Sequence, residues 1–195
     1  MKTMNRIRRP GLSFLMAAAL VAGLLAAYWA APEAGAHAVD GQPQAPAFTQ
    51  QGPQDWLNSP PLAWSDLRGQ VVLLDFWTFM CWNCYRSFPW LTGLEERLKD
   101  RDFRVIGVHT PEFEAEKDRA RIAERADHFG LHHPIMVDND HAYWKAMGNR
   151  YWPAYYLIDR QGRVRHYFVG ETHAGDERAV EIEARIRELL AEPTD

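Results

Sequence analysis

Residues 71–84 of the chain read VVLLDFWTFMCWNC. Its first part, Val71–Trp77, is an apolar run interrupted by Asp75, which predicts a short strand buried on both faces of a sheet. The chain has two cysteines, Cys81 and Cys84, and they follow this strand at C-x-x-C spacing. This order predicts a strand that leads into a helix whose first turn carries both thiols.

The predicted position of the two thiols suits disulfide exchange. Cys81 would begin the helix, where unpaired backbone N–H groups and the positive end of the helix dipole favour a thiolate. The thiolate is the nucleophile in disulfide exchange, so Cys81 is the predicted attacking group. Cys84 lies about one helical turn further on and is the predicted resolving thiol.

Two other interpretations of the cysteine pair remain open at this point. A structural disulfide across so short a loop would contribute only about 2 kcal/mol, against roughly 3 kcal/mol for a 15-residue loop. A zinc site would need about four ligands. His128 and His132 are four residues apart, but Gly130 separates them, and the pair His132-His133 before Pro134 is typical of a surface loop.

The remaining pattern predicts an α/β fold with a central mixed β-sheet flanked by helices, because strands alternate with helices and a hairpin and a helix close the chain. Asp159–Gly162 is the predicted hairpin turn. Further strands are expected at 103–109, 135–137, 154–159 and 164–169, and helices at 89–101, 114–129, 141–148 and 176–191.

The N-terminus has the pattern of an export signal. A basic stretch at 2–9 precedes about 21 apolar and small residues at 11–31, and roughly 20 such residues span a bilayer. Ala36-His37-Ala38 has the form of a cleavage site. Residues 1–38 are therefore expected to be an uncleaved signal anchor or a signal peptide. Either places the protein in the periplasm or another extracytoplasmic space, and the first would tether it to the inner membrane.

Composition divides the rest of the chain into a linker and a folded domain. Residues 39–55 are rich in Ala, Gly, Pro and Gln and are predicted to be a flexible linker, with the folded domain at 56–195. The formal net charge is −4, and residues 1–38 carry +3 of it, which leaves −7 for the remainder. An acidic domain argues against nucleic acid as a partner.

Several segments together resemble a known family. Leu74–Cys84 resembles the active-site strand and helix of thioredoxins, and Tyr151–Asp159 (YWPAYYLID) resembles their cis-proline loop and the strand that follows. The segments VIGVH at 105–109 and PIMVDN at 134–139 are similar to the exported TlpA-like branch, and GVHTPEF at 107–113 is similar to the thioredoxin domain of DipZ-like proteins. The resemblance implies a thioredoxin-like fold with the extra αβ insertion of TlpA-like proteins.

The resemblance also implies roles for individual residues. Asp75 matches the buried acid that handles the proton of the resolving cysteine, and burial should raise the pKa of its carboxyl. Pro153 matches the cis-proline that faces the dithiol, and Trp152 the residue whose backbone binds an extended client peptide. Trp82 and Asn83 replace the common Gly-Pro pair between the cysteines, so the redox direction stays open. Together with Trp152 and Pro153, they are the residues expected to bind the client.

The expected function is an extracytoplasmic thiol–disulfide oxidoreductase that exchanges disulfides with protein cysteines. TlpA-like resemblance favours a reductant, for example in cytochrome c maturation. Its electrons would come from a membrane dithiol donor, with no bound cofactor and no metal. The alternatives are a disulfide-forming oxidant and a metal chaperone or adaptor on the same fold. His109, at the end of a predicted strand, is expected to be a core-edge histidine.

Overall fold

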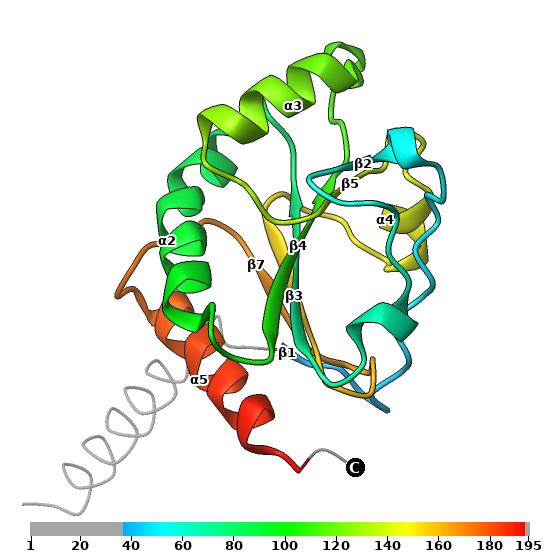
Figure 1. The fold of residues 1–195 in the computed structure, drawn as a ribbon. Helices are drawn as coiled ribbons and strands as arrows, with labels where there is room; N and C mark the ends of the chain where they lie inside the picture. Colours follow the sequence, from blue (N-terminus) through cyan, green and yellow to red (C-terminus); the bar gives the residue numbers. More distant parts are fainter. Residues whose placement is uncertain (1–36, 194–195) are drawn as a thin grey trace, which may run out of the picture. The chain divides into compact units, whose positions relative to one another are not determined.

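A computed structural model describes residues 37–193 of the protein, and all but the last two residues of the predicted anchor or signal peptide at 1–38 lie outside this range (Figure 1). Within it, seven strands form one mixed sheet in the order β1-β7-β6-β3-β4-β5-β2. Of the helices between residues 37 and 193, none is both long enough and apolar enough to cross a bilayer.

The centre of the sheet is β3 (Val71–Trp77), all of whose residues are buried. It pairs in parallel with β4 (Phe103–His109) and antiparallel with β6 (Ala154–Ile158). The outer strands are β1 (His37–Ala38), β2 (Trp56–Leu57), β5 (Ile135–Val137) and β7 (Val164–Val169). A strand buried on both faces explains the nearly continuous apolar run in the sequence.

Helices and loops cover the two faces of the sheet unequally. Leu73 and Trp77 point to the face covered by α2 (Trp82–Leu98), α3 (Arg119–His128) and α5 (Glu177–Ala191). In Figure 1, α2 and α5 lie on the same side of β3 and β4. Leu74 and Phe76 point to the other face, which packs against α4 (Ala142–Ala146) and the chain before β3.

The αβ insertion predicted from the TlpA-like resemblance is present. It consists of α3 and β5, and β5 extends the sheet by pairing in parallel with β4. The predicted helix at 114–129 is divided into a short 3-10 turn, η3 (Glu114–Glu116), and α3. The break occurs because the Asp118 carboxylate accepts hydrogen bonds from the backbone N–H groups of Ala120 and Arg121 and so begins a new helix.

Helix α2 begins earlier than the apolar spacing predicted. It starts at Trp82, seven residues before Pro89, and continues through that proline to Leu98. The start is set by Cys81, which is the N-cap residue, rather than by the proline. Both cysteines therefore belong to the first turn, as the C-x-x-C position indicated.

The segment at 39–55, predicted to be a flexible linker, packs against the domain. Ala45 and Phe48 are buried in the core of the α4 face, and Phe48 contacts the ring of Trp64 at a centroid distance of 4.9 Å. Strand β1 pairs with β7. The packed domain thus includes residues before Trp56. Composition did not show this, because the segment has one aromatic residue, Phe48, and is otherwise held by backbone hydrogen bonds such as that from Ala45 N–H to the Gly162 carbonyl.

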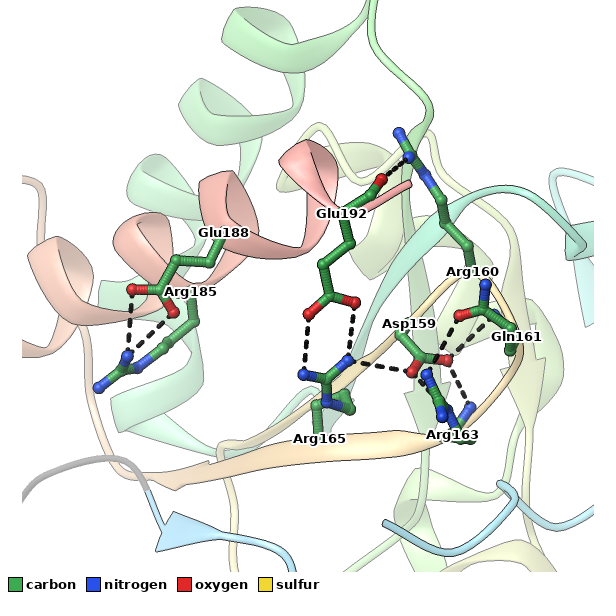
Figure 2. Close-up of polar contacts among 8 residues, drawn as sticks. All are labelled: Asp159, Arg160, Gln161, Arg163, Arg165, Arg185, Glu188 and Glu192. Atoms are coloured by element: carbon green, nitrogen blue, oxygen red, sulfur yellow. Dashed lines mark hydrogen bonds and ion pairs between the residues drawn. The ribbon is translucent and has the colours of Figure 1, made fainter. Parts of the chain in front are cut away.

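A cluster of ion pairs joins the C-terminus of α5 to the β6–β7 hairpin (Figure 2). Arg165 contacts both the buried Asp159, at 3.2 Å, and Glu192, at 2.9 Å. Asp159 also accepts hydrogen bonds from the backbone and side chain of Arg163. Burial raises the pKa of Asp159, but these hydrogen bonds outweigh it and hold the pKa below its usual value.

Candidate active site

The dithiol lies at the start of α2, directly after the loop that follows β3. Cys81 and Cys84 form a disulfide, and their Cα atoms are 5.3 Å apart. The backbone N–H of Cys84 donates to the Cys81 sulfur at 3.2 Å, so this sulfur caps the helix. A sulfur that accepts such a bond and faces the positive end of the helix is favoured as a thiolate after reduction.

The two sulfurs differ in access. Cys81 is 8% exposed and lines a surface groove, whereas Cys84 is fully buried. A client disulfide can therefore approach Cys81 and not Cys84. This difference agrees with the predicted division into an attacking and a resolving thiol.

The groove beside Cys81 has a volume of about 350 Å³. Its lining includes three of the four predicted client-binding residues, Trp82, Asn83 and Trp152. The fourth, Pro153, is buried next to Trp152, and the peptide bond between these two residues is cis, as predicted. The loop before β6 and the start of α2 thus form opposite walls of one groove, together with Met80, Glu112, Arg150 and Tyr151.

Trp152 is held by its indole ring. Its Nε1–H donates to the backbone carbonyl of Thr110 at 3.1 Å, and its ring packs against Trp144 at a centroid distance of 4.2 Å. Trp144 is a partly buried packing residue of the core on the α4 face. These contacts fix the wall of the groove that the resemblance assigns to client binding.

Glu116 is a buried carboxylate that the sequence did not single out. It accepts hydrogen bonds from the Thr78 hydroxyl at 2.5 Å and the Met80 backbone N–H at 2.8 Å. Its second oxygen accepts from the backbone N–H groups of Glu112 and Phe113, each at 2.8 Å. It therefore joins the loop before Cys81 to the loop after β4. No periodic pattern marks such a residue, because it lies in a charged segment, Glu114–Lys117.

Asp75 is buried in the sheet face below α2, with 1% exposure. Burial, helped by the nearby Glu95, raises the pKa of the Asp75 carboxyl to about 8. A carboxyl with such a pKa can take up or release a proton near neutral pH, which is the property expected of it.

His109 is fully buried, so it lies deeper than a core-edge position. One ring nitrogen, Nε2, is 3.3 Å from the Thr78 hydroxyl, and burial lowers the pKa of His109 to about 3. The ring is therefore neutral at neutral pH and contributes to the packing under the active-site loop, where it stacks on Phe79.

The histidines considered as metal ligands do not form a site. Among residues 37–193, no group of three or more His, Cys, Asp or Glu side chains is arranged to hold a metal ion. The expectation that His133 lies in a surface loop is wrong. Its side chain is 1% exposed and its Nδ1 is 2.9 Å from the Glu95 carboxylate. The residue is buried because it begins the approach to β5 and points to the core face.

A reactive sulfur at a helix start, a buried acid and a cis-proline wall on one mixed sheet define a class of protein. This class is the thioredoxin-like thiol–disulfide oxidoreductases. A match to the Redoxin family covers residues 40–182, and the chain belongs to that family.

Known relatives support this assignment. The chain is 45% identical over 143 residues to Protein DipZ of Mycobacterium tuberculosis (strain CDC 1551 / Oshkosh), which covers 72% of this chain and 20% of that protein. It is 32% identical over 141 residues to Thiol-disulfide oxidoreductase YkuV of Bacillus subtilis (strain 168), covering 72% of this chain and 91% of YkuV. The chain thus spans about a fifth of the length of DipZ and most of YkuV.

Solved structures share the fold. A thioredoxin-like protein in its oxidized form superposes with a TM-score of 0.64 and 31% identity, covering 76% of this chain and 96% of that one. A thiol-disulfide isomerase from Corynebacterium glutamicum superposes with a TM-score of 0.63, covering 80% of this chain and all of the other. At 22% identity, the second comparison shows the fold alone.

Proposed function

We propose that this protein is an extracytoplasmic reductant of disulfides in other proteins. In the proposed reaction, the Cys81 thiolate attacks a client disulfide and forms a mixed disulfide, and one client sulfur leaves as a thiolate. Cys84 then attacks the Cys81 sulfur, releases the second client thiol and leaves the Cys81–Cys84 disulfide. Two electrons pass to the client, and a membrane dithiol donor restores the reduced protein.

The exposed apolar rim of the groove is the observation that carries this proposal. Five large apolar side chains are exposed in the described part of the chain, and Met80, Trp82 and Tyr151 line the groove next to Cys81. Exposed apolar side chains that gather at one place are typical of protein-binding sites. Trp82, the most exposed of them at 67%, stands directly after the attacking sulfur.

The proposed residue roles follow from this arrangement. Trp82, Asn83, Trp152 and Pro153 bind the client, the first two from the helix and the other two from the facing loop. Asp75 accepts the proton of the Cys84 thiol, because its carboxyl points to the sheet face that α2 covers. Export is supported by the basic and apolar pattern of residues 1–38, which would either anchor the protein or be removed as a signal peptide.

Trapping of mixed disulfides tests the client-exchange reaction. The Cys84→Ser variant keeps the attacking thiol and lacks the resolving one, so we expect it to accumulate clients that dithiothreitol releases. Cys81→Ser is the matched control, because its remaining thiol is buried. If Cys84→Ser captures no proteins, or if Cys81→Ser captures as many, the proposed reaction is wrong.

The reduction potential of the purified domain tests the direction of transfer. A reductant should have a potential well below about −200 mV, whereas an oxidant would lie near −120 mV. A value near the second figure would contradict the reductant role and leave the exchange reaction intact.

A client-binding role for the rim can be separated from the chemistry of the thiols. We expect Trp82→Ala to raise KM for a protein disulfide by about tenfold, since an aromatic side chain that becomes buried when the client binds contributes on the order of 1–2 kcal/mol. The rate of Cys81 alkylation by iodoacetamide should stay within about twofold of wild type. An unchanged KM would show that Trp82 does not bind the client.

A further inference from the structure

Buried polar atoms without a hydrogen-bond partner lie beside Gly107 on β4 and on its register partner, Asp75. Among the described residues, these are both carboxyl oxygens of Asp75, Nε1 of Trp77 and Nε2 of His133. Gly107 is the register partner of Asp75 on the neighbouring strand. A Cβ atom on Gly107 would lie 3.0 Å from Trp77 Nε1 and 3.2 Å from His133 Nε2.

The absence of a side chain at Gly107 leaves room for the His133 ring next to the register partner of Asp75. Residues in register on adjacent strands project to the same face, and the strands are about 4.8 Å apart, so the Asp75 carboxyl projects next to this point. Buried polar groups almost always have partners, and a group of unpartnered ones marks an internal water molecule or a functional site.

The other ring nitrogen of His133 contacts a residue nearer the surface. His133 Nδ1 is 2.9 Å from Glu95 Oε2, and the exposed fraction rises from 1% for the His133 side chain to 27% for Glu95. Glu95 lines a surface cleft of about 780 Å³. Exposure thus rises from Asp75 and His133 in the interior of the domain to Glu95 at the surface cleft.

Helix α2 carries both Glu95 and the second cysteine of the dithiol, Cys84. Glu95 follows Cys84 by eleven residues, which is close to three helical turns, so both side chains lie on the stripe of α2 that faces the sheet. The buried residues Phe88 and Leu91 occupy the same stripe between them. Asp75 lies on β3, and Glu95 is near enough to contribute to the raised pKa of its carboxyl.

We propose that His133 and Glu95 form a proton route that connects Asp75 with the solvent in this cleft. The inference rests on the proposed function, because it serves the step in which Cys84 loses its proton. Asp75–COOH gives its proton to His133 Nε2, the Nδ1 proton passes to the Glu95 carboxylate, and Glu95 releases it to water. The Asp75 carboxylate then accepts the Cys84 proton, and no electron moves along this route.

The other titratable groups around the route do not compete for the proton. Tyr155 on β6 faces Asp75, and burial keeps its pKa far above its usual value, so it stays a neutral phenol. His109 on β4 stays neutral because burial lowers its pKa to about 3. Charged side chains occur at the cleft, where the lining includes Glu96, Lys99, Arg104 and His132.

Glu95→Gln and His133→Gln test the route, with Glu96→Gln as the matched control. Glu96 lines the same cleft, and its exposed side chain pairs with Lys99. Each glutamine can still form hydrogen bonds but cannot relay a proton. The measurement is the single-turnover rate of disulfide formation in the reduced protein with an excess of a disulfide peptide, from pH 6 to pH 9.

We expect both variants to slow disulfide formation about tenfold at pH 7. The difference in rate from wild type should decrease toward pH 9, and imidazole buffer should largely restore the rate. Glu96→Gln should match wild type. In the Asp75→Asn background, Glu95→Gln should have no further effect, because the groups act in series.

Two results would overturn the route. The first is a wild-type pH profile in Glu95→Gln. The second is a slowing that is equal at every pH, additive with Asp75→Asn and insensitive to imidazole. Thermal unfolding of each variant separates these results from loss of structure, and Glu95→Gln decides alone if His133→Gln does not fold. A wild-type protein that fails to react with the peptide would instead overturn the proposed function.

Discussion

Asp75 places a titratable carboxyl where the sheet would otherwise be apolar, and this has a cost in stability. Because burial raises its pKa from 3.8 to about 8, the folded protein retains a proton that the unfolded chain loses above about pH 4. The contribution of Asp75 to folding therefore becomes less favourable as the pH rises from about 4 to 8. This loss of stability supports a role for the Asp75 carboxyl in the reaction.

We expect Asp75→Asn to stabilise the protein at pH 7 by roughly 2–4 kcal/mol, since one pKa unit corresponds to 1.36 kcal/mol. The gain should be small at pH 4, where the carboxyl is protonated in both states. The same variant should slow disulfide exchange. Denaturant unfolding at the two pH values measures the first effect, and equal gains at both would contradict the raised pKa.

Some residues of the site were predictable from the sequence, and others were not. Cys81, Cys84, Asp75 and the cis-proline at Pro153 follow from local order along the chain and from the resemblance. Glu116 and His133 could not be found this way. Their environment is created by tertiary packing, which places a residue from a polar segment in the core.

The β6–β7 hairpin shows how an element can depend on one buried charge. Asp159 accepts hydrogen bonds from the backbone N–H groups of Gln161 and Arg163 and from the side chains of Arg163 and Arg165. Figure 2 shows these contacts together with the Arg165–Glu192 pair that leads to α5. The turn therefore positions both the last strands and the closing helix.

We expect Asp159→Asn to destabilise the protein by about 2–3 kcal/mol at pH 7, because it removes charge-assisted hydrogen bonds. The pKa of Asp159 is lower in the folded protein, so its contribution is present above the unfolded value and is lost as the pH falls through the folded one. The difference should thus decrease in acid. Asp102→Asn, which changes an exposed carboxylate 3.6 Å from the Arg160 guanidinium, is the control and should cost less than about 1 kcal/mol.

Element boundaries were harder to predict than element types. The strands at 71–77, 103–109, 135–137 and 164–169 agree with the structure, because buried strands have short and distinct apolar runs. The starts of α2 and α3 differ from the prediction. Both are set by a capping side chain, Cys81 or Asp118, and not by apolar spacing.

At the scale of the whole domain, the segment before Trp56 belongs to the core. Phe48 contacts Trp56, Trp64 and Tyr143, with ring centroids 4.9–5.3 Å apart. A composition rich in Ala, Pro and Gln is typical of linkers, so the sequence could not show that one phenylalanine in this segment fills the space beside α4.

We expect Phe48→Ala to destabilise the domain by about 3–5 kcal/mol, as buried Phe→Ala changes usually do. Val180→Ala, on the exposed surface of α5, is the control and should change stability by less than about 0.5 kcal/mol. Chemical unfolding measures both. A cost for Phe48→Ala as small as that of the control would show that the segment is a linker after all.

In the proposed reaction, Cys81 is the reactive thiol and Cys84 is the protected one. This assignment is tested most directly by alkylating the reduced protein with iodoacetamide across a pH series and locating the label by mass spectrometry. We predict that Cys81 is labelled first, already at pH values where an ordinary cysteine, with a pKa of about 8.5, is protonated. Labelling of Cys84 first, or of Cys81 only above that range, would contradict the account.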